Sequence, residues 1–216
     1  MSDFRRDFIR FAIARKAVSF GEFKTKAGRL SPYFFNSGLF SDGDSLNQLA
    51  QFYAKAILAS GVQFDMLFGP AYKGIPLAAA VAVALAQAGR NAPFSFNRKE
   101  AKDHGERGNI IGADLVGRVL VVDDAISAGT AVRESYRIIR AEHATPCGVM
   151  VALDRMERGA GALSAVQEVE QSYNIPVISI ATLDDLVSYL RSDPRFTRNL
   201  EAVDKYRQQY GVRAHA

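Results

Sequence analysis

The sequence is poor in cysteine, because Cys147 is the only one among 216 residues. A single thiol excludes an intrachain disulfide and a zinc site built from a cysteine cluster. Long apolar runs are also lacking, since the longest, residues 75–86, is too short to span a bilayer. Residues 1–10 are charged and contain no apolar segment of the signal-peptide type. We therefore expect a soluble, cytoplasmic protein with no membrane partner.

Charge of one sign is not concentrated anywhere, because the sequence has no long run of like charges. Its net charge of +4 suits an anionic ligand but does not by itself imply nucleic acid. No Gly-Lys-[Ser/Thr] P-loop ending and no Gly-x-Gly-x-x-Gly after a strand candidate occur, which argues against nucleoside triphosphatases and dinucleotide-binding proteins. With 48% hydrophobic residues the chain can bury a full core, and its length fits one domain over residues 1–216.

The N-terminal part has its own pattern. Apolar residues recur at helical spacing over residues 3–17, which predicts an amphipathic helix. Residues 18–37 contain short β-prone runs, and Pro32 among them favours an edge strand. A further helix is predicted over about 45–60. Residues 1–40 are therefore interpreted as a helix and a small cap (hood) that contains short β-strands.

From residue 62 to about 191, strand and helix signals alternate. This alternation predicts an α/β core with a parallel, twisted sheet flanked by helices on both faces. The segment 99–112 is polar and without periodicity, so it is interpreted as a long loop. The predicted strands are 64–68, 93–98, 118–123, 148–153 and 176–181, and the predicted helices are 74–88, 130–141, 160–173 and 183–191.

Ligands of open α/β sheets bind at the carboxyl ends of the strands, which selects the loops 69–74, 98–112, 123–130 and 154–159. The third of these begins with two adjacent carboxylates, Asp123 and Asp124, which need a cationic or hydroxylic partner.

The residues after these two acids are small or carry hydroxyl groups. Small side chains let backbone N–H groups converge on an anion, Ser127 and Thr130 add hydroxyl donors, and the helix that starts near Thr130 directs its positive end there. Acids that bind a diol beside a phosphate cradle suit a ribose 5-phosphate. An ordinary strand–turn–helix with an aspartate N-cap is the alternative for any single feature of the run.

The run VLVVDDAISAGT (119–130) resembles the phosphoribosyl-diphosphate motif of type I phosphoribosyltransferases. Four other stretches resemble the bacterial orotate phosphoribosyltransferases and occur in the family's order: KTKAGRLSPYFFNSG (24–38), LFGPAYKGIP (67–76), FNRKEAKDHGERG (96–108) and LDRMERG (153–159). The departures are mild, because Ser127 replaces a frequent threonine but keeps the hydroxyl, and Ala125 replaces a frequent valine.

The resemblance implies the type I phosphoribosyltransferase fold and the reaction of orotate with phosphoribosyl diphosphate to give orotidine 5′-monophosphate and diphosphate. It also implies Mg²⁺, held mainly by the substrate and water with Asp123 and Asp124 nearby. A homodimer is implied too, in which the 98–108 loop reaches the partner's site. No nucleic acid is expected as a partner.

The resemblance assigns residues to each role. Lys102, His104, Asp123 and Asp124 are the expected catalytic residues. Orotate is expected to contact Phe34, Phe35, Ser127 and Arg155. Phosphoribosyl diphosphate is expected to contact Lys26, Tyr72, Lys73, Arg98, Lys99, Lys102, His104, Asp123, Asp124, Ala125, Ile126, Ser127, Ala128, Gly129, Thr130 and Ala131.

Several of these assignments also follow from the chemistry of the residues. The cations between Arg98 and His104 could neutralise a leaving diphosphate, although a solvated charged loop is the ordinary alternative. In the loop 69–74, the glycines are expected to permit unusual backbone angles, Lys73 to add charge, and the family's cis peptide to fall at residues 71–72.

Arg155 offers a planar cation for the orotate carboxylate. A structural salt bridge to Asp154 is the alternative role for this residue.

Two other functions remain to be weighed. A purine phosphoribosyltransferase would share the diphosphate motif but has no use for the stretches 24–38 and 153–159. A regulator that senses a metabolite and binds nucleic acid should carry a DNA-binding segment or a dense basic face. Residues 1–40 have no helix-turn-helix pattern, which disfavours that class.

Overall fold

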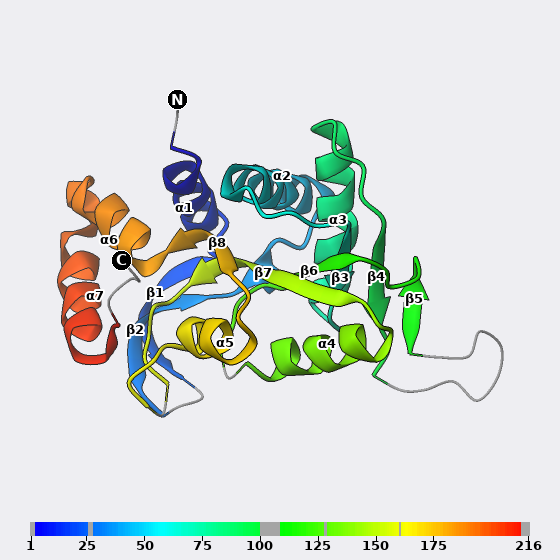
Figure 1. The fold of residues 1–216 in the computed structure, drawn as a ribbon. Coiled ribbons are helices and arrows are strands. Elements are labelled where there is room, and N and C mark those ends of the chain that lie inside the picture. The colour runs from blue at the N-terminus through cyan, green and yellow to red at the C-terminus, as the bar shows by residue number, and fades with distance from the viewer. Residues whose placement is uncertain (1–2, 26–27, 100–108, 128, 160, 213–216) are drawn as a thin grey trace.

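The computed structural model describes residues 3–25, 28–99, 109–127, 129–159 and 161–212. Its centre is a six-stranded sheet with the strand order β5-β4-β3-β6-β7-β8, and a two-stranded hairpin lies beside it (Figure 1). Within the described residues no helix is long and apolar enough to cross a membrane. The strands of the large sheet are β3 (Met66–Gly69), β4 (Phe94–Asn97), β5 (Ile110–Gly112), β6 (Arg118–Val122), β7 (Thr145–Asp154) and β8 (Val177–Thr182).

Neighbouring strands of this sheet are parallel except β4 and β5, which are antiparallel. The predicted α/β fold is confirmed, but the expectation of a wholly parallel sheet is wrong at one edge. β5 lies in the segment 99–112 that the sequence pattern presents as a loop, and Ile111 pairs with Phe96 of β4. A strand of three residues has too little periodicity to recognise, so its pairing with β4 defines it.

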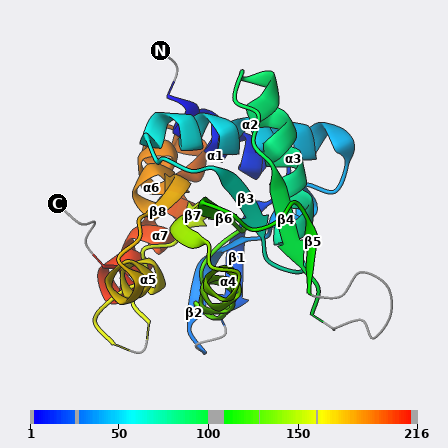
Figure 2. The ribbon, with the colours of Figure 1, turned by 45° about the vertical axis from the view of Figure 1, so that its right-hand side comes forward.

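Helices cover both faces of the sheet (Figure 1 and Figure 2). One face carries α1 (Phe4–Ala14), α2 (Gly43–Ser60) and α3 (Gly74–Gln87), and the other carries α4 (Thr130–Ala141) and α5 (Ala165–Tyr173). Strand β6 supplies both cores, because successive side chains of a strand point to opposite faces. Leu120 and Val122 join the core under α2 and α3, while Val119 and Val121 join the core under α4.

The N-terminal cap is an antiparallel hairpin of β1 (Val18–Lys24) and β2 (Leu30–Phe35). It stands at the end of the molecule that also carries α6 (Leu183–Arg191) and α7 (Thr197–Tyr210) (Figure 1). Helix α7 packs against β2. The short strands of the hood are thus as expected, whereas α7 is an element that the sequence pattern did not predict.

Candidate active site

The candidate site lies where the chain changes direction across the sheet. β3 and β6 are parallel neighbours, but β3 leads through α3 to β4 on one side and β6 leads through α4 to β7 on the other. Their carboxyl-terminal loops, 69–74 and 123–130, therefore diverge to opposite faces, and the place between them, here called the crevice, is where open α/β sheets bind ligands. Lys73 of the first loop and Asp124 of the second form an ion pair across it, with 2.7 Å between Nζ and Oδ2.

Asp123, the first of the two acids, is buried at the end of β6. Burial, and then the charge of neighbouring Asp124, raise its pKa to about 7. Its Oδ1 accepts a hydrogen bond of 2.9 Å from the backbone N–H of Asp124, and its carbonyl oxygen accepts one of 2.7 Å from the hydroxyl of Tyr53 on α2. The Asp123 carboxyl group is therefore held in place by hydrogen bonds of its residue, with a pKa raised by burial.

Asp124, the second acid, is more exposed and has three partners. Its Oδ2 accepts hydrogen bonds from Lys73 Nζ and from Ser37 Oγ at 2.6 Å, and its Oδ1 accepts one from the backbone N–H of Ala125 at 2.9 Å. Asp124 thus meets one cationic and one hydroxylic group, and both come from the protein itself, whereas the Asp123 carboxylate accepts from a backbone N–H. A ribose hydroxyl or a diphosphate in the crevice can exchange with these partners.

The loop that follows the two acids is partly open to solvent. Ser127 and Thr130 are exposed, while Ala125, Ile126 and Ala131 are half-buried. Gly129 takes a left-handed φ of +67° and is the N-cap of α4, which begins at Thr130 as predicted. Within the described residues no side chain caps this helix, so its first N–H groups can serve an anion. Ala128 lies outside the described residues.

The loop 69–74 is built on close backbone approach. An ideal Cβ at Gly69 would lie 2.2 Å from the carbonyl oxygen of Gly74, and one at Gly74 would lie 2.9 Å from that of Val122. Neither glycine has a positive φ, so the expectation of unusual backbone angles is wrong. Glycine is required at both positions because there is no space for a Cβ atom. The peptide between Ala71 and Tyr72 is cis, as the resemblance implied.

The end of β4 supports this loop. The buried side chain of Asn97 accepts a hydrogen bond from the backbone N–H of Ala71, with 2.9 Å between N and Oδ1. The Lys99 ammonium lies 5.1 Å from the ring centroid of exposed Tyr72. The half-buried Arg98 donates its backbone N–H to Asn109. The loops after β3 and β4 therefore meet, whereas Lys102, His104 and Lys26 lie outside the described residues.

Arg155 follows β7 and contacts the hood. Its Nε and Nη2 donate to Glu157 Oε1 at 2.9 and 2.6 Å, and Nη2 also donates to Ser31 Oγ at 3.0 Å. The salt bridge considered from the sequence was to Asp154, but Asp154 instead accepts from the backbone N–H of Met156. The structure therefore gives Arg155 a structural partner other than the expected one.

The two aromatic residues expected at the acceptor differ in exposure. Phe34 is 43% exposed and stacks on Phe23, whereas Phe35 is buried in the core. Of the two, only Phe34 has a ring that is exposed enough to contact an acceptor. Phe35 could contact an acceptor only through its backbone groups.

Five supporting residues were absent from the sequence-based candidates. Ser37, Asn97 and Glu157 lie in the stretches that the sequence singled out, and the strand-end rule could have selected Asn97 and Glu157. Tyr53 and Tyr206, whose hydroxyl donates to Glu157 Oε2 at 3.1 Å, lie on helices, where a buried aromatic ordinarily indicates core packing. Only the tertiary contacts identify these two residues.

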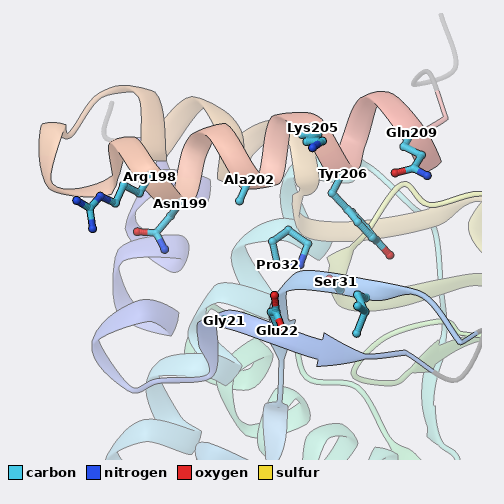
Figure 3. A pocket seen from close by; sticks show the side chains of 11 residues that line it. Gly21, Glu22, Ser31, Pro32, Arg198, Asn199, Ala202, Lys205, Tyr206 and Gln209 are labelled. Atoms are coloured by element: carbon cyan, nitrogen blue, oxygen red, sulfur yellow. The ribbon is translucent and has the colours of Figure 1, made fainter.

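A hollow of about 520 Å³ lies between the hairpin and α7 (Figure 3). None of the described residues in the four predicted ligand loops lines it. The candidate site is instead the crevice between loops. Residues that line the hollow include Glu22, Ser31, Pro32, Arg198, Lys205 and Tyr206.

Comparisons with known proteins show which family the chain is similar to. The model of the phosphoribosyl transferase domain family matches residues 42–171. The orotate phosphoribosyltransferase of Thiobacillus denitrificans is 64% identical over 212 residues, which cover 98% of this chain and 100% of that protein. The enzyme of that name from Nitrosospira multiformis is 65% identical over 213 residues, 99% of this chain and 93% of the relative.

A solved structure gives the same result. The crystal structure of orotate phosphoribosyltransferase from Francisella tularensis superposes with a TM-score of 0.87 at 40% identity. The match covers 95% of this chain and 100% of that one. The hood and the α/β core therefore occur together in a solved relative.

Proposed function

The chain belongs to the orotate phosphoribosyltransferase family, and from that premise we propose that it transfers the 5-phosphoribosyl group of phosphoribosyl diphosphate to orotate. The products are orotidine 5′-monophosphate and diphosphate, a step in the biosynthesis of pyrimidine nucleotides such as UMP. The observation that carries the proposal is the 64% and 65% identity to relatives of that name along nearly the whole chain.

The donor half of the reaction suits the crevice between β3 and β6. The exposed loop before α4, with the positive end of that helix, suits the 5-phosphate. Asp123 and Asp124 suit the ribose hydroxyls, because carboxylate oxygens accept hydrogen bonds from a diol. Lys73 and the backbone of the 69–74 loop suit the diphosphate. Substrate binding would then replace the ion pair between Lys73 and Asp124 with contacts to the ligand.

The transfer breaks the bond between ribose C1 and diphosphate and forms a bond from C1 to a ring nitrogen of orotate, which releases its proton to solvent. Positive charge develops on the ribose and negative charge on the leaving group, so cations near the diphosphate lower the barrier. Lys73 and Lys99 stand on the two loops that meet there. The resemblance adds Lys102 and His104, for which closure of their loop would also exclude water.

Mg²⁺ is part of the proposal, and the donor set is compatible with it. The described residues contain no cluster of three or more His, Cys, Asp or Glu side chains that could hold a metal. The hard oxygens of Asp123 and Asp124 would supply few ligands, so phosphate and water would supply the rest. The ion would neutralise charge on the diphosphate. Activity should disappear with a chelator and return with excess Mg²⁺.

A homodimer with shared sites is also proposed from the resemblance. Mixing the Lys102→Ala and Asp124→Asn variants tests it directly. If each site takes its lysine from one subunit and its aspartate from the other, the mixed dimer regains one intact site and therefore activity. A mixture as inactive as its components, despite exchange of subunits, would show that the sites are not shared.

A steady-state assay tests the activity itself. The wild-type protein should release diphosphate from phosphoribosyl diphosphate only when orotate and Mg²⁺ are present. Reaction with adenine or hypoxanthine but not with orotate would overturn the proposal in favour of a purine enzyme. Failure with every base would favour a regulator that binds phosphoribosyl diphosphate without turnover.

A further inference from the structure

The loop after β7 contains a carboxylate that the reaction does not use. Glu157 is two residues beyond Arg155, and its side chain is only 14% exposed. Its Oε1 accepts both Arg155 bonds and a longer one of 3.3 Å from the hydroxyl of Tyr33. Its Oε2 accepts a hydrogen bond of 3.1 Å from the hydroxyl of Tyr206 on α7. One carboxylate thus joins the loop after β7, the hood and α7.

These contacts fix the orientation of the Arg155 guanidinium. The guanidinium edge formed by Nε and Nη2 donates two hydrogen bonds to Glu157, and Nη2 also donates one to Ser31 of the hood. The ring of Tyr33 lies below the guanidinium, with Cζ 4.5 Å from its centroid. Nη1 has no hydrogen bond to any described residue in the structure and is the corner left for a ligand.

Glu157 is itself held by neutral donors. Burial raises the pKa of Tyr33 well above its ordinary value, and burial followed by the charge of Glu157 raises that of Tyr206. Both hydroxyls therefore keep their protons at neutral pH and donate to the carboxylate. Figure 3 shows Tyr206 extending from α7 toward the strand that carries Ser31. The last helix of the fold thereby reaches the group that holds Arg155.

We propose that Glu157, anchored by Tyr206, is a positioning residue that orients Arg155 toward the carboxylate of the acceptor. This inference rests on the proposed function, because it takes orotate as the acceptor. An arginine side chain has many rotamers, and two bonds on one edge leave the other corner aimed in a single direction. On this basis α7, which contributes Tyr206, is part of the support of the acceptor site.

Neutralisation of a half-buried arginine is the alternative role for Glu157, and it predicts different kinetics. A carboxylate that only balances charge weakens the hold of Arg155 on an anion, so its removal should improve orotate binding. A carboxylate that positions Arg155 should do the opposite when it is removed. The direction of the change in orotate KM therefore separates the two roles.

The test compares Glu157→Ala with Glu157→Gln. The alanine variant should raise the orotate KM about tenfold, with much smaller changes in kcat and in the KM for phosphoribosyl diphosphate. The glutamine variant keeps an acceptor oxygen for Arg155 and should restore the orotate KM to within about threefold of wild type. Glu201→Ala, at an exposed glutamate on α7, is the matched control and should change neither KM.

A double-mutant cycle shows whether Glu157 acts through Arg155. In an Arg155→Ala background, Glu157→Ala should raise the orotate KM no further, because its target is gone. An orotate KM that is unchanged or lower in Glu157→Ala alone would overturn the proposal. Equal increases in both KM values would also overturn it, since they would indicate general loss of structure.

Tyr206→Phe keeps the inference testable if Glu157→Ala does not fold. It removes one hydroxyl and no ring, and it should raise the orotate KM about two- to fivefold while the KM for phosphoribosyl diphosphate stays constant. An unchanged orotate KM would exclude the anchor role of Tyr206. Wild-type activity with orotate is measured first, so that failure of the proposed function is recognised before any variant is interpreted.

Discussion

Lys73 Nζ lies 2.7 Å from Asp124 Oδ2, and this ion pair connects the two loops that diverge from neighbouring strands at the centre of the sheet. The lysine side chain is 59% exposed and the aspartate side chain 14%. The lysine of the pair is therefore open to solvent, where an incoming anion can compete with Asp124 for it. A pair of this exposure contributes little to stability.

Lys73→Met should weaken substrate binding far more than it weakens the fold. The KM for phosphoribosyl diphosphate should rise about tenfold, because one cation of the diphosphate subsite is lost. The free energy of unfolding should change by less than about 1 kcal/mol. Steady-state kinetics and urea unfolding measure the two quantities. Lys55→Met, at an exposed lysine on α2, is the control, and an equal effect there would refute a specific role for Lys73.

Asp123→Asn should change how stability depends on pH. The ordinary pKa of the carboxyl is 3.8 and its pKa in the fold is about 7, so the folded protein binds this proton more tightly than the unfolded chain. The stability that the protonated Asp123 side chain gives the fold is therefore fully present below about pH 4. It is lost as pH rises through about 7. The difference of about three pKa units corresponds to about 4 kcal/mol. The side chain of the Asp123→Asn variant stays neutral at every pH, so this loss of stability does not occur. Its amide oxygen still accepts the hydrogen bond from the backbone N–H of Asp124.

Urea unfolding at about pH 4.5 and about pH 8 measures this effect. As pH rises, the free energy of unfolding of the Asp123→Asn variant should increase relative to that of the wild type. Asp65 illustrates the opposite pH dependence, because hydrogen bonds from Arg118 lower the pKa of its carboxyl group to about 2. The stabilising contribution of Asp65 is present above its ordinary pKa of 3.8 and is lost as pH falls toward 2. Parallel pH profiles for the wild type and the Asp123→Asn variant would contradict the titration of Asp123 near neutral pH.

Gly69→Ala should destabilise the fold because the new Cβ meets backbone. The ideal position lies 2.2 Å from the carbonyl oxygen of Gly74 and 2.8 Å from the Cβ of Ala78. Relief requires movement of the whole loop 69–74, so we expect a loss of about 2–3 kcal/mol and a raised KM for phosphoribosyl diphosphate. Gly43→Ala is the matched control, since nothing lies within 4 Å of its Cβ. Calorimetry should show that variant unchanged or slightly more stable.

Elements with strong local signals could be predicted from the sequence. The predicted helices 130–141 and 183–191 have the bounds found in the structure. Helix α5 begins at Ala165 rather than 160, because Ser164 and Gln167 form a capping box. That pattern was present in the sequence and could have given the boundary. The hood, its hairpin and the alternation of the core also follow from local patterns.

The elements that could not be predicted depend on tertiary contacts. Helix α7 buries only Val203 and Tyr206, which is too few apolar positions for a clear helical period. In the site, residue types near strand ends identified the acids and Lys73, but not the pairing between them. That pairing depends on the adjacency of β3 and β6, which is a property of topology. Glu157 was overlooked because Asp154 is the nearer acid in the sequence.

Asn97→Ala tests whether the loop 69–74 depends on its neighbour strand. The change removes the acceptor for the Ala71 backbone N–H, which Asn97 Oδ1 meets at 2.9 Å. The Ala71 N–H is half-buried, so losing its partner should lower the free energy of unfolding by about 1 kcal/mol, the low end of the cost of an unpaired donor. The loop should also lose its fixed approach to the diphosphate, which raises the KM for phosphoribosyl diphosphate but not that for orotate. Asn199→Ala on α7 is the control, and equal changes in both KM values for the Asn97→Ala variant would show that the hydrogen bond supports the fold rather than the loop.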